Sequence, residues 1–438
     1  AKFPAEEETY NVRAAVLRHD VRHPVVNDRN FLLWRAYAVR AWPTLTVIGP
    51  DGYVVGAHSG EFDAEVLGEF LEELIGRYDA QGLIDRTPLE LSPEKERQLE
   101  TLLSFPGKVL YVPPAQVPPD WRGPAREGLL FVADTDHHRI LQFGVEDGRL
   151  GSVYGAGEPG LLDGSSRRAR FNAPQGLTLR GDALYVADTE NHAVRKIALP
   201  GGVVTTVAGT GRQAQPWPEE GPAREAALNS PWDVLAIGEE LFIAMAGSHQ
   251  IWRLHLPSGR LSLFAGDGRE ALQDGPRLLA RLAQPSGLAT DGEQLWFVDS
   301  ETSSLRSVPL SGLDERVVTH VGQGLFDFGD VDGQRDRARM QHALGVACAG
   351  GRVYVADAYN NKIRMFDPQS GELQTLAGSG EPGLQDGAAG EACFWEPGGL
   401  SAGGDRLWVA DTNNHAVRGV DRITGEVRTV ELLDPTDD

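Results

Sequence analysis

The segment YVADTENHAVRKI (185–197) recurs along the chain in related forms and decides the fold. Its other copies read FVADTDHHRI (131–140), FIAMAGSHQI (242–251), WFVDSETSSL (296–305), YVADAYNNKI (354–363) and WVADTNNHAV (408–417). The fourth residues of the six copies are Asp134, Asp188, Met245, Asp299, Asp357 and Asp411, so the repeat is 54 to 58 residues long. A repeat of this length indicates one supersecondary unit per copy.

Each copy lies inside a longer pattern. An apolar strand that follows Pro and Gly precedes it, as in FNAPQGL (171–177) and FWEPGGL (394–400). A Val- and Leu-rich strand follows it, and a glycine-rich acidic loop such as GSGEPGLQDG (378–387) ends the unit. Four antiparallel strands repeated radially form a propeller blade. The sequence therefore predicts an all-β propeller of six blades.

The repeat resembles the NHL repeat, since Asn191-His192 and Asn414-His415 match the first two letters of that name. The resemblance covers residues 105–431, and we predict a six-bladed NHL β-propeller over 105–432 with an acidic tail at 433–438. Some NHL propellers bind RNA, but the acidic charge described below disfavours that function here.

The repeated Asp is expected where a strand ends and a turn begins, with its carboxylate accepting backbone N–H bonds of the turn. The His or Asn four residues later is expected to join the turn to the neighbouring strand. A metal bound by a ring of six carboxylates is an alternative, although Met245 interrupts that ring. Asp163, Asp274, Asp332 and Asp386 are alternative Ca²⁺ ligands, but no blade has enough carboxylates to require an ion.

Two segments match the glycine pattern of dinucleotide sites, GAGEPG (155–160) and GSGEPG (378–383). A phosphate cradle also requires a following helix in a βαβ unit, and the surroundings here are all-β. We interpret these glycines as turn residues and predict no cofactor and no metal.

Residues 1–79 have a different organisation. The patterns predict a helix over 5–19, a strand over 24–28, a helix over 29–39, strands over 45–49 and 53–59, and a helix over 63–77. The pieces HPVVND (23–28), AYAVRAWPTLTVI (36–48) and GPDGYVV (49–55) resemble the C-terminal two-thirds of a redoxin-type thioredoxin fold. The predicted fold class is thus multidomain, a partial α/β thioredoxin-like domain followed by the propeller.

The resemblance implies that Pro43 is the cis-proline of that fold, which presents its backbone to a bound thiol or peptide. We therefore assign Trp42, Pro43 and Thr44 as binding residues. The family's cysteine motif has no counterpart here, because Cys348 and Cys393 lie in the propeller, so we predict no catalytic residue. The chain begins with Ala1 and not with Met, and we expect an N-terminal truncation; a cysteine motif before Ala1 belongs to the second of the two functional classes below.

Residues 80–104 are predicted to be a linker. Ser92 and Pro93 form a helix start signal, which predicts a short helix over 93–103. The segment PLEL (88–91) is a candidate edge strand that docks the two domains.

Composition limits the partners. Asp and Glu (63) outnumber Lys and Arg (41), which gives a net charge of −22 and no basic surface for nucleic acid or anionic lipid. No apolar run reaches the roughly 18 residues of a membrane span. Two cysteines are too few for a disulfide scaffold and indicate a reducing compartment, which we take to be the cytoplasm.

The loops after the second and fourth strands of each blade should open on one face, which we call the loop face. Propellers usually bind on such a face. The loop over 209–228 is the longest and contains Trp217, a candidate partner anchor. Trp232 is interpreted as the residue that replaces the Gly of the Pro-x-Gly segment, and we expect it to pack between blades.

Two functional classes remain. In the first, the protein is an interaction platform whose propeller binds a protein or peptide on the loop face. In the second, the longer chain is a thiol-disulfide oxidoreductase or peroxide-handling protein, and the propeller recruits its client. A hydrolase or lyase with a channel metal is disfavoured, because no His cluster occurs on the repeated inner strands.

Overall fold

The protein is described from a computed structural model, which describes residues 2–60, 64–98, 100–118, 121, 127–312 and 315–434. The chain divides into two compact units, residues 1–99 and residues 100–438. The division lies inside the predicted linker. Of the predicted acidic tail, residues 435–438 lie outside the described part of the chain.

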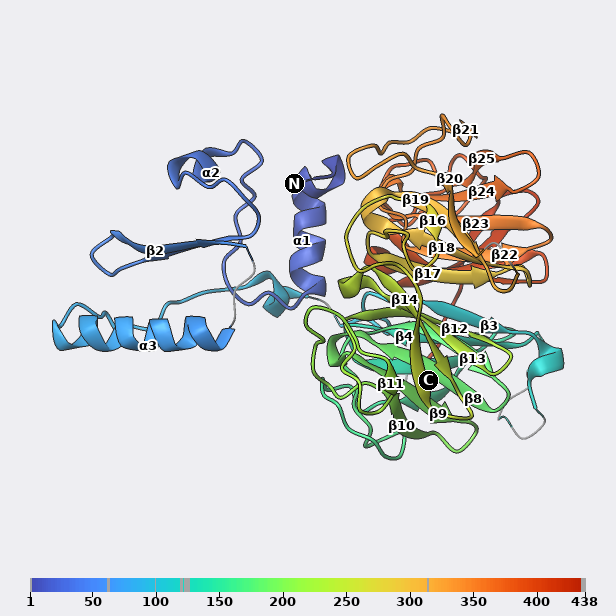
Figure 1. Cartoon of the computed structure of the whole chain (residues 1–438), viewed down its shortest axis with the longest axis horizontal. Helices are drawn as coiled ribbons and strands as arrows, with labels where there is room; N and C mark the ends of the chain where they lie inside the picture. Colours follow the sequence, from blue (N-terminus) through green and yellow to red (C-terminus); the bar gives the residue numbers. More distant parts are fainter. Residues whose placement is uncertain are drawn as a thin grey trace. The chain divides into compact units, whose positions relative to one another are not determined.

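Unit 1 contains helices and one two-stranded sheet (Figure 1). Its elements are η1 (Pro4–Glu7), α1 (Thr9–Arg18), α2 (Leu32–Ala36), β1 (Thr44–Ile48), β2 (Val54–Ser59), α3 (Ala64–Ala80) and η2 (Glu94–Arg97). Strands β1 and β2 pair in antiparallel register from Thr44 opposite Ser59 to Ile48 opposite Val54. The order of helices and of the two paired strands agrees with the sequence prediction.

Three predicted elements of the first hundred residues are wrong. Residues 24–28 are not a strand, since no neighbouring strand pairs with them among the described residues. Residues 88–91 likewise form no strand. The helix predicted over 93–103 is reduced to the single 3₁₀ turn η2, because Leu103 leaves the helical path and is buried with the side chains of unit 2.

Unit 2 consists of six antiparallel sheets, each built from consecutive strands (Figure 1). We number these sheets as blades 1 to 6. Blades 1 to 3 contain β3 (Val109–Val112), β4 (Leu129–Asp134), β5 (Arg139–Gly144) and β6 (Leu150–Tyr154); β7 (Pro174–Arg180), β8 (Ala183–Asp188), β9 (Ala193–Ala198) and β10 (Val203–Ala208); and β12 (Pro231–Ile237), β13 (Glu240–Met245), β14 (Gln250–His255) and β15 (Arg260–Ala265).

Blades 4 to 6 contain β17 (Pro285–Thr290), β18 (Gln294–Asp299), β19 (Ser304–Pro309) and β20 (Arg316–Val321); β22 (Gly345–Ala349), β23 (Arg352–Asp357), β24 (Lys362–Asp367) and β25 (Glu372–Ala377); and β26 (Pro397–Gly403), β27 (Arg406–Asp411), β28 (Ala416–Asp421) and β29 (Val427–Thr429). The two-residue strands β11 (Gly221–Pro222), β16 (Gly275–Pro276) and β21 (Gly333–Gln334) add to the outer edges of blades 3 to 5. The six-bladed propeller is confirmed.

The core of unit 2 lies between the blades. Six clusters of buried side chains occur in the described residues, and each joins two neighbouring blades. One of them packs Val109 and Leu130 of blade 1 against Trp408 and Val417 of blade 6 and so closes the ring. Apolar side chains on both faces of each inner strand explain why the repeated segments are apolar at almost every position.

The junction of blades 6 and 1, which we call the seam, also has polar contacts. Phe105 N donates to His415 Nδ1 (3.0 Å), and Thr412 Oγ1 donates to the carbonyl of Pro106 (2.9 Å). The C-terminal segment adds a bond from Leu150 N to the carbonyl of Leu433 (2.9 Å). In the part of the chain that is described, no helix is both long and apolar enough to cross a membrane.

Candidate functional site

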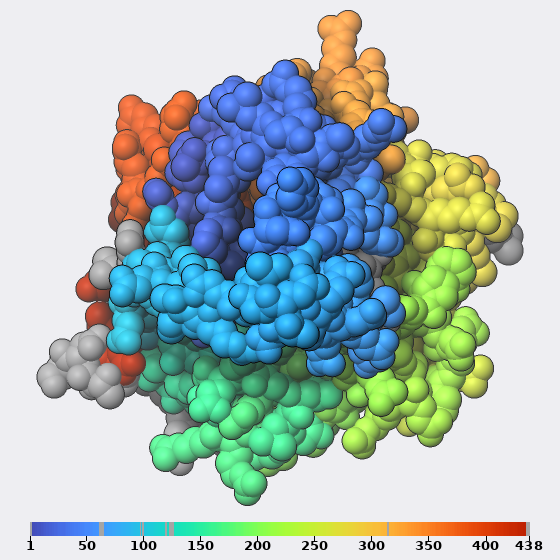
Figure 2. Space-filling model, turned by 90° about the vertical axis from the view of Figure 1, so that its left-hand side faces the viewer, coloured from blue at the N-terminus to red at the C-terminus, as the bar shows by residue number. Residues whose placement is uncertain are grey.

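Exposed large apolar side chains of unit 2 occur on its loop face. They lie on the inter-blade loops, which join the outer strand of one blade to the inner strand of the next. We call the following residues the apolar rim: Leu161, Leu162, Trp217, Phe326, Val331 and Leu384. Leu278 and Leu279 are also exposed, but they follow β16 and lie beside the turn between β19 and β20, at the other end of the blade. Four of the five inter-blade loops contribute at least one rim residue. The loop that contains β21 and Phe326 projects from the surface of unit 2 (orange in Figures 1 and 2).

Neighbouring rim loops touch one another. The side chain of Leu161 approaches Gly211 in the next loop so closely that a Cβ atom there would lie 2.6 Å from Leu161 Cδ2. The ring of Trp217 lies over Gly268 in the loop after that, where a Cβ atom would lie 3.0 Å from Trp217 Cε3. The first three loops therefore form a continuous surface, and glycine permits the close approach.

In five of the six blades the turn after the second strand begins at a buried carboxylate. Asp188 Oδ1 accepts the backbone N–H of Asn172 (2.7 Å), and its Oδ2 accepts Asn191 Nδ2 (2.8 Å) and Arg195 Nη1 (2.7 Å). The first donor lies in the loop before strand β7, sixteen residues earlier. The prediction that Asp188 caps its own turn through backbone N–H groups is therefore wrong, because the carboxylate joins the turn to the inter-blade loop.

Arg195 extends this connection across the loop. Its Nη2 donates to the carbonyl of Leu162 (2.9 Å) and to Asp163 Oδ1 (2.8 Å), and Asp163 in turn accepts Thr206 N (3.1 Å). The same four positions recur in blades 4, 5 and 6, and we call each set a tetrad. The tetrads are Asp188, Arg195, Asp163 and Thr206; Asp299, Arg306, Asp274 and Thr319; Asp357, Arg364, Asp332 and Thr375; and Asp411, Arg418, Asp386 and Thr429.

Sequence reasoning missed the four arginines, although each lies seven residues after the repeated Asp. It also treated Asp163, Asp274, Asp332 and Asp386 as alternative Ca²⁺ ligands, and the structure shows each accepting an arginine. No group of three or more His, Cys, Asp or Glu side chains able to hold a metal occurs among the described residues. The tetrads hold the rim loops in place.

Burial dominates the electrostatics of the tetrads. It raises the pKa of Asp188, Asp357 and Asp411 to about 6, although the arginine and the hydrogen bonds to each carboxylate act in the opposite direction. Burial also raises the pKa of Asp299. The outer carboxylates Asp163 and Asp386 have lowered pKa values, because Thr N–H and O–H groups and an arginine together outweigh their partial burial.

Blades 1 and 3 lack the tetrad. In blade 3 the strand register places Met245 and Trp252 at the positions of Asp188 and Arg195, so both charges of the buried pair are replaced together. In blade 1 Leu141 stands at the arginine position, and Arg139 Nε donates to Asp134 Oδ2 (2.7 Å) from two residues earlier. Removing both partners of a buried ion pair is far less costly than removing one, which explains the paired replacement.

The residue after each turn joins its blade to the next. His192 has a left-handed backbone (φ 45°), and its Nδ1 accepts the N–H of Ser230 in the segment before blade 3 (3.1 Å). This agrees with the expected role of the His or Asn four residues after Asp. The equivalent acceptors are His138, His249, Ser303, Asn361 and His415, and their donors are Ala173, Gln284, His342, Glu396 and Phe105.

The loop around Trp217 belongs to the apolar rim, and the Trp217 side chain is half exposed. Trp232 is placed differently from the expectation. The register pairs Asp233 with Ala244, as it pairs Gly287 with Val298 and Gly399 with Ala410. Asp233, and not Trp232, therefore stands at the glycine position, and Trp232 lines the central axis.

Trp42, Pro43 and Thr44 lie together where β1 begins. The Trp42–Pro43 peptide bond is cis, as the thioredoxin resemblance implies. The ring of Trp42 is exposed and packs against Trp34, with 4.6 Å between ring centroids. Thr44 Oγ1 donates to the carbonyl of Ala41 (2.7 Å), and the carbonyl of Pro43 accepts Gly60 N (2.9 Å).

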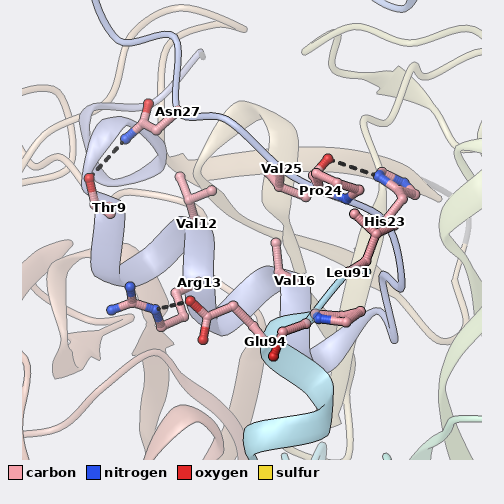
Figure 3. Close-up of a pocket in the computed structure, with 12 residues that line it drawn as sticks. Thr9, Val12, Arg13, Val16, His23, Pro24, Val25, Asn27, Leu91 and Glu94 are labelled. Carbon is pink, nitrogen blue, oxygen red and sulfur yellow. Dashed lines mark hydrogen bonds and ion pairs between the residues drawn. The ribbon is translucent and has the colours of Figure 1, made fainter. Parts of the chain in front are cut away.

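A cavity of about 280 Å³ lies elsewhere in unit 1 (Figure 3). Val12 and Val16 of α1 face Val25 across it, and Leu91 lies at its edge (Figure 3). Arg13 Nε donates to Glu94 Oε1 (3.1 Å) along one side. The cavity has an apolar floor and contains none of the predicted site residues.

Comparison with known proteins identifies the repeat. A family model for the NHL repeat matches residues 171–197 and 394–419. Human NHL repeat-containing protein 2 is 38% identical over 471 residues, which cover 99% of this chain and 62% of that protein. Protein SUPPRESSOR OF QUENCHING 1, chloroplastic, of Arabidopsis thaliana is 37% identical over 452 residues, which cover 99% of this chain and 42% of that protein. The chain thus spans less than two-thirds of the length of these relatives.

Among solved structures, a protein of unknown function from Bacteroides thetaiotaomicron matches with a TM-score of 0.51 and 16% identity. The match covers 72% of this chain and 69% of that one, and it bears on the fold alone. The NHL propeller and the resemblance to NHL repeat-containing protein 2 are therefore shown.

Proposed function

From this resemblance over almost the whole chain, we propose that the protein is an interaction platform that binds a protein or peptide partner on the loop face of its propeller. One observation carries the proposal, namely the apolar rim. Exposed apolar patches that polar residues surround mark interaction sites in proteins of this kind. The rim residues recur on four of the five inter-blade loops, on the face where those loops and the turns after the second strands open.

The rim is also preorganised. The tetrads of blades 2, 4, 5 and 6 connect the inter-blade loop before each of these blades to a buried carboxylate, and the six inter-blade acceptors connect each turn to the next blade. A surface that is already ordered loses little conformational entropy when a partner binds. Aromatic side chains such as Trp217 and Phe326 contribute large contact areas, which makes them the expected centres of binding energy.

The test is a selection of binding peptides from a random display library on the intact chain, followed by affinity measurements on variants. We expect Trp217→Ser, Leu161→Ser and Phe326→Ser each to weaken the selected peptides by tenfold or more. Ile423→Ser is the matched control, because Ile423 is as exposed as Phe326 (82% each) and lies in the turn between β28 and β29 at the other end of its blade. Equal loss in the control variant, or no loss in the rim variants, would contradict the proposal.

The second part of the proposal concerns unit 1, which we assign as a thioredoxin-like domain placed next to the propeller in the sequence. Support comes from the order of α1, α2, β1, β2 and α3 and from Trp42, Pro43 and Thr44 at the start of β1. We assign these three residues as a second docking surface. The proposed compartment is the cytoplasm, since Cys348 and Cys393 are both unpaired.

A redox function of a longer chain is the alternative. Strand β1 pairs only with β2 among the described residues, and Val26, Leu32, Tyr53 and Val54 are exposed in unit 1. Additional strands that carry a cysteine motif would cover such surfaces. Expression of the endogenous chain, followed by a thiol-disulfide exchange assay with glutathione, tests this alternative. Exchange that a cysteine variant abolishes would favour it, and an inactive endogenous chain would leave the platform function alone.

A further inference from the structure

The inner strands of the propeller meet at the axis with almost no side chains between them. We call the inner-strand residue that lines the axis the axial position of a blade. It is glycine in four blades, namely Gly176, Gly287, Gly345 and Gly399. A Cβ atom on Gly287 would lie 2.6 Å from the carbonyl oxygen of Leu344, and one on Gly345 would lie 2.6 Å from that of Gly398. Backbone of one blade therefore packs directly on backbone of the next.

The other two blades have charged residues at this position. Blade 1 contributes Lys108 and blade 3 contributes Asp233, and the ammonium group of Lys108 donates to Asp233 Oδ2. The Lys108 side chain is 13% exposed and that of Asp233 is 4% exposed. Blade 2 separates the two blades along the ring, so the pair crosses the axis instead of joining neighbours.

Asp233 has further bonds that fix its position. Its Oδ2 also accepts the N–H of Leu288 at the inner strand of blade 4 (2.9 Å), and its Oδ1 accepts the N–H of Val234 (2.8 Å). Lys108 is thereby connected to two blades on the far side of the ring. The cavity left around the pair is about 20 Å³ and is lined by residues from all six blades, which is room for roughly one water molecule.

The connectivity of the chain shows at which junction between blades the ring can open. Each described blade is built from consecutive strands, so no strand is exchanged between blade 6 and blade 1. Five of the six junctions between blades are crossed by a loop that continues into the next inner strand. At the seam, by contrast, blade 6 is joined to blade 1 by the end of the described chain, where Leu433 forms a bridge with Arg149 beside β6. An opening motion of the ring must therefore begin at the seam, with blade 1 moving away from blade 6.

We propose that Lys108 and Asp233 form an axial clasp that keeps the propeller ring closed at the seam. When blade 1 moves outward, Lys108 must leave Asp233, and each buried charge loses its partner. The clasp thus opposes seam opening from the opposite side of the ring, in addition to the direct seam contacts of His415 and Leu433. It also closes the axial channel, so that ligands reach the propeller from its faces.

Native-state hydrogen exchange on the intact chain tests this proposal with Asp233→Asn as the decisive variant. Asp233 lies on blade 3, away from the seam, so a purely local role predicts faster exchange only around β12 and β17. The clasp predicts in addition at least tenfold faster exchange at the seam amides of β3, β26 and Leu433. Amides of β24 and β25, the outer strands of blade 5, should be unchanged.

Lys108→Met removes the pair from the other side and must give the same pattern at β26 and Leu433. Arg277→Met is the matched control, because Arg277 Nε donates to Glu315 (2.7 Å) outside the axis, and this variant should leave the seam unaffected. Limited proteolysis of each variant gives a second measurement when exchange is too fast to follow, with cleavage expected first near residues 100–112 and 430–434. Seam protection that stays within threefold of the parent in both axial variants would overturn the proposal, as would loss of protection that is uniform over all six blades.

Discussion

The Nη1 atom of Arg195 lies 2.7 Å from Oδ2 of Asp188, and both side chains are completely buried. This contact connects the turn after β8 to the loop before β7, which carries Leu161 and Leu162 of the apolar rim. The stability of the fold and the shape of the proposed binding surface therefore depend on the same pair of residues.

Asp188→Ala is expected to lower the free energy of unfolding by about 3–5 kcal/mol, because the buried Arg195 guanidinium loses the buried one of its two carboxylate partners. Urea denaturation followed by tryptophan fluorescence measures the change. Asp182→Ala, at an exposed position in the turn between β7 and β8, serves as the control and should change the value by about 0.5 kcal/mol or less. Equal stability of the two variants would show that the pair contributes nothing.

The double variant Asp188→Leu with Arg195→Met should be less destabilised than the sum of the two single variants, by about 0.5–3 kcal/mol. Blade 3 provides the precedent, since Met245 and Trp252 replace both charges there. A double-mutant cycle measured by denaturation gives the coupling energy. Additive effects of the two substitutions would mean that the buried charges do not depend on one another.

The pH dependence of stability should differ between the parent protein and Asp188→Asn. Burial raises the pKa of Asp188 from 3.8 in the unfolded chain to about 6 in the folded one. Its contribution to stability is therefore complete below pH 3.8 and is lost as the pH rises to about 6. As the pH rises from 4 to 7, the free energy of unfolding of the parent protein should therefore fall by about 2–3 kcal/mol relative to that of the Asn variant. A constant difference, or a shift in favour of the parent, would show that the folded pKa is not raised.

His192→Ala should lower the free energy of unfolding by about 1–3 kcal/mol, because the N–H of Ser230 loses its acceptor and the backbone is left-handed at this position. His192→Asn should change it by less than about 1 kcal/mol. Asn361 already performs this role in blade 5, where its Oδ1 accepts Glu396 N (2.9 Å) and its φ is 52°. Thermal and urea denaturation of the two variants would contradict the assignment if Asn and Ala were equally destabilising.

The sequence predicts the propeller well, because six copies of one segment show the same pattern of apolar residues, and each copy packs in the same way between neighbouring blades. The tetrad arginines were missed, since an arginine on an apolar strand is buried only when a loop distant in sequence supplies its acceptors. The sequence pattern assigns Trp232 to the glycine position of the Pro-x-Gly segment, whereas Asp233 stands there in the structure. Only the strand register, with Asp233 opposite Ala244, corrects that assignment.

In unit 1, local patterns predicted segments whose structure depends on distant partners. Residues 24–28 are apolar and extended, but a strand needs a neighbour to pair with. The helix predicted from Pro93 stops after one turn, because burial of Leu103 among the side chains of unit 2 competes with helical geometry. Trp42, Pro43, Thr44 and Trp217 remain predicted binding residues.

Hydrogen exchange of the intact chain with and without a selected binding peptide tests the central claim most directly, since it locates the bound surface without a mutation. We expect protection in the inter-blade loops 155–173, 209–230, 322–344 and 378–396, which carry the apolar rim. Protection confined to the turns at the other end of the blades, such as 199–202 and 421–425, with the rim loops unchanged, would contradict it.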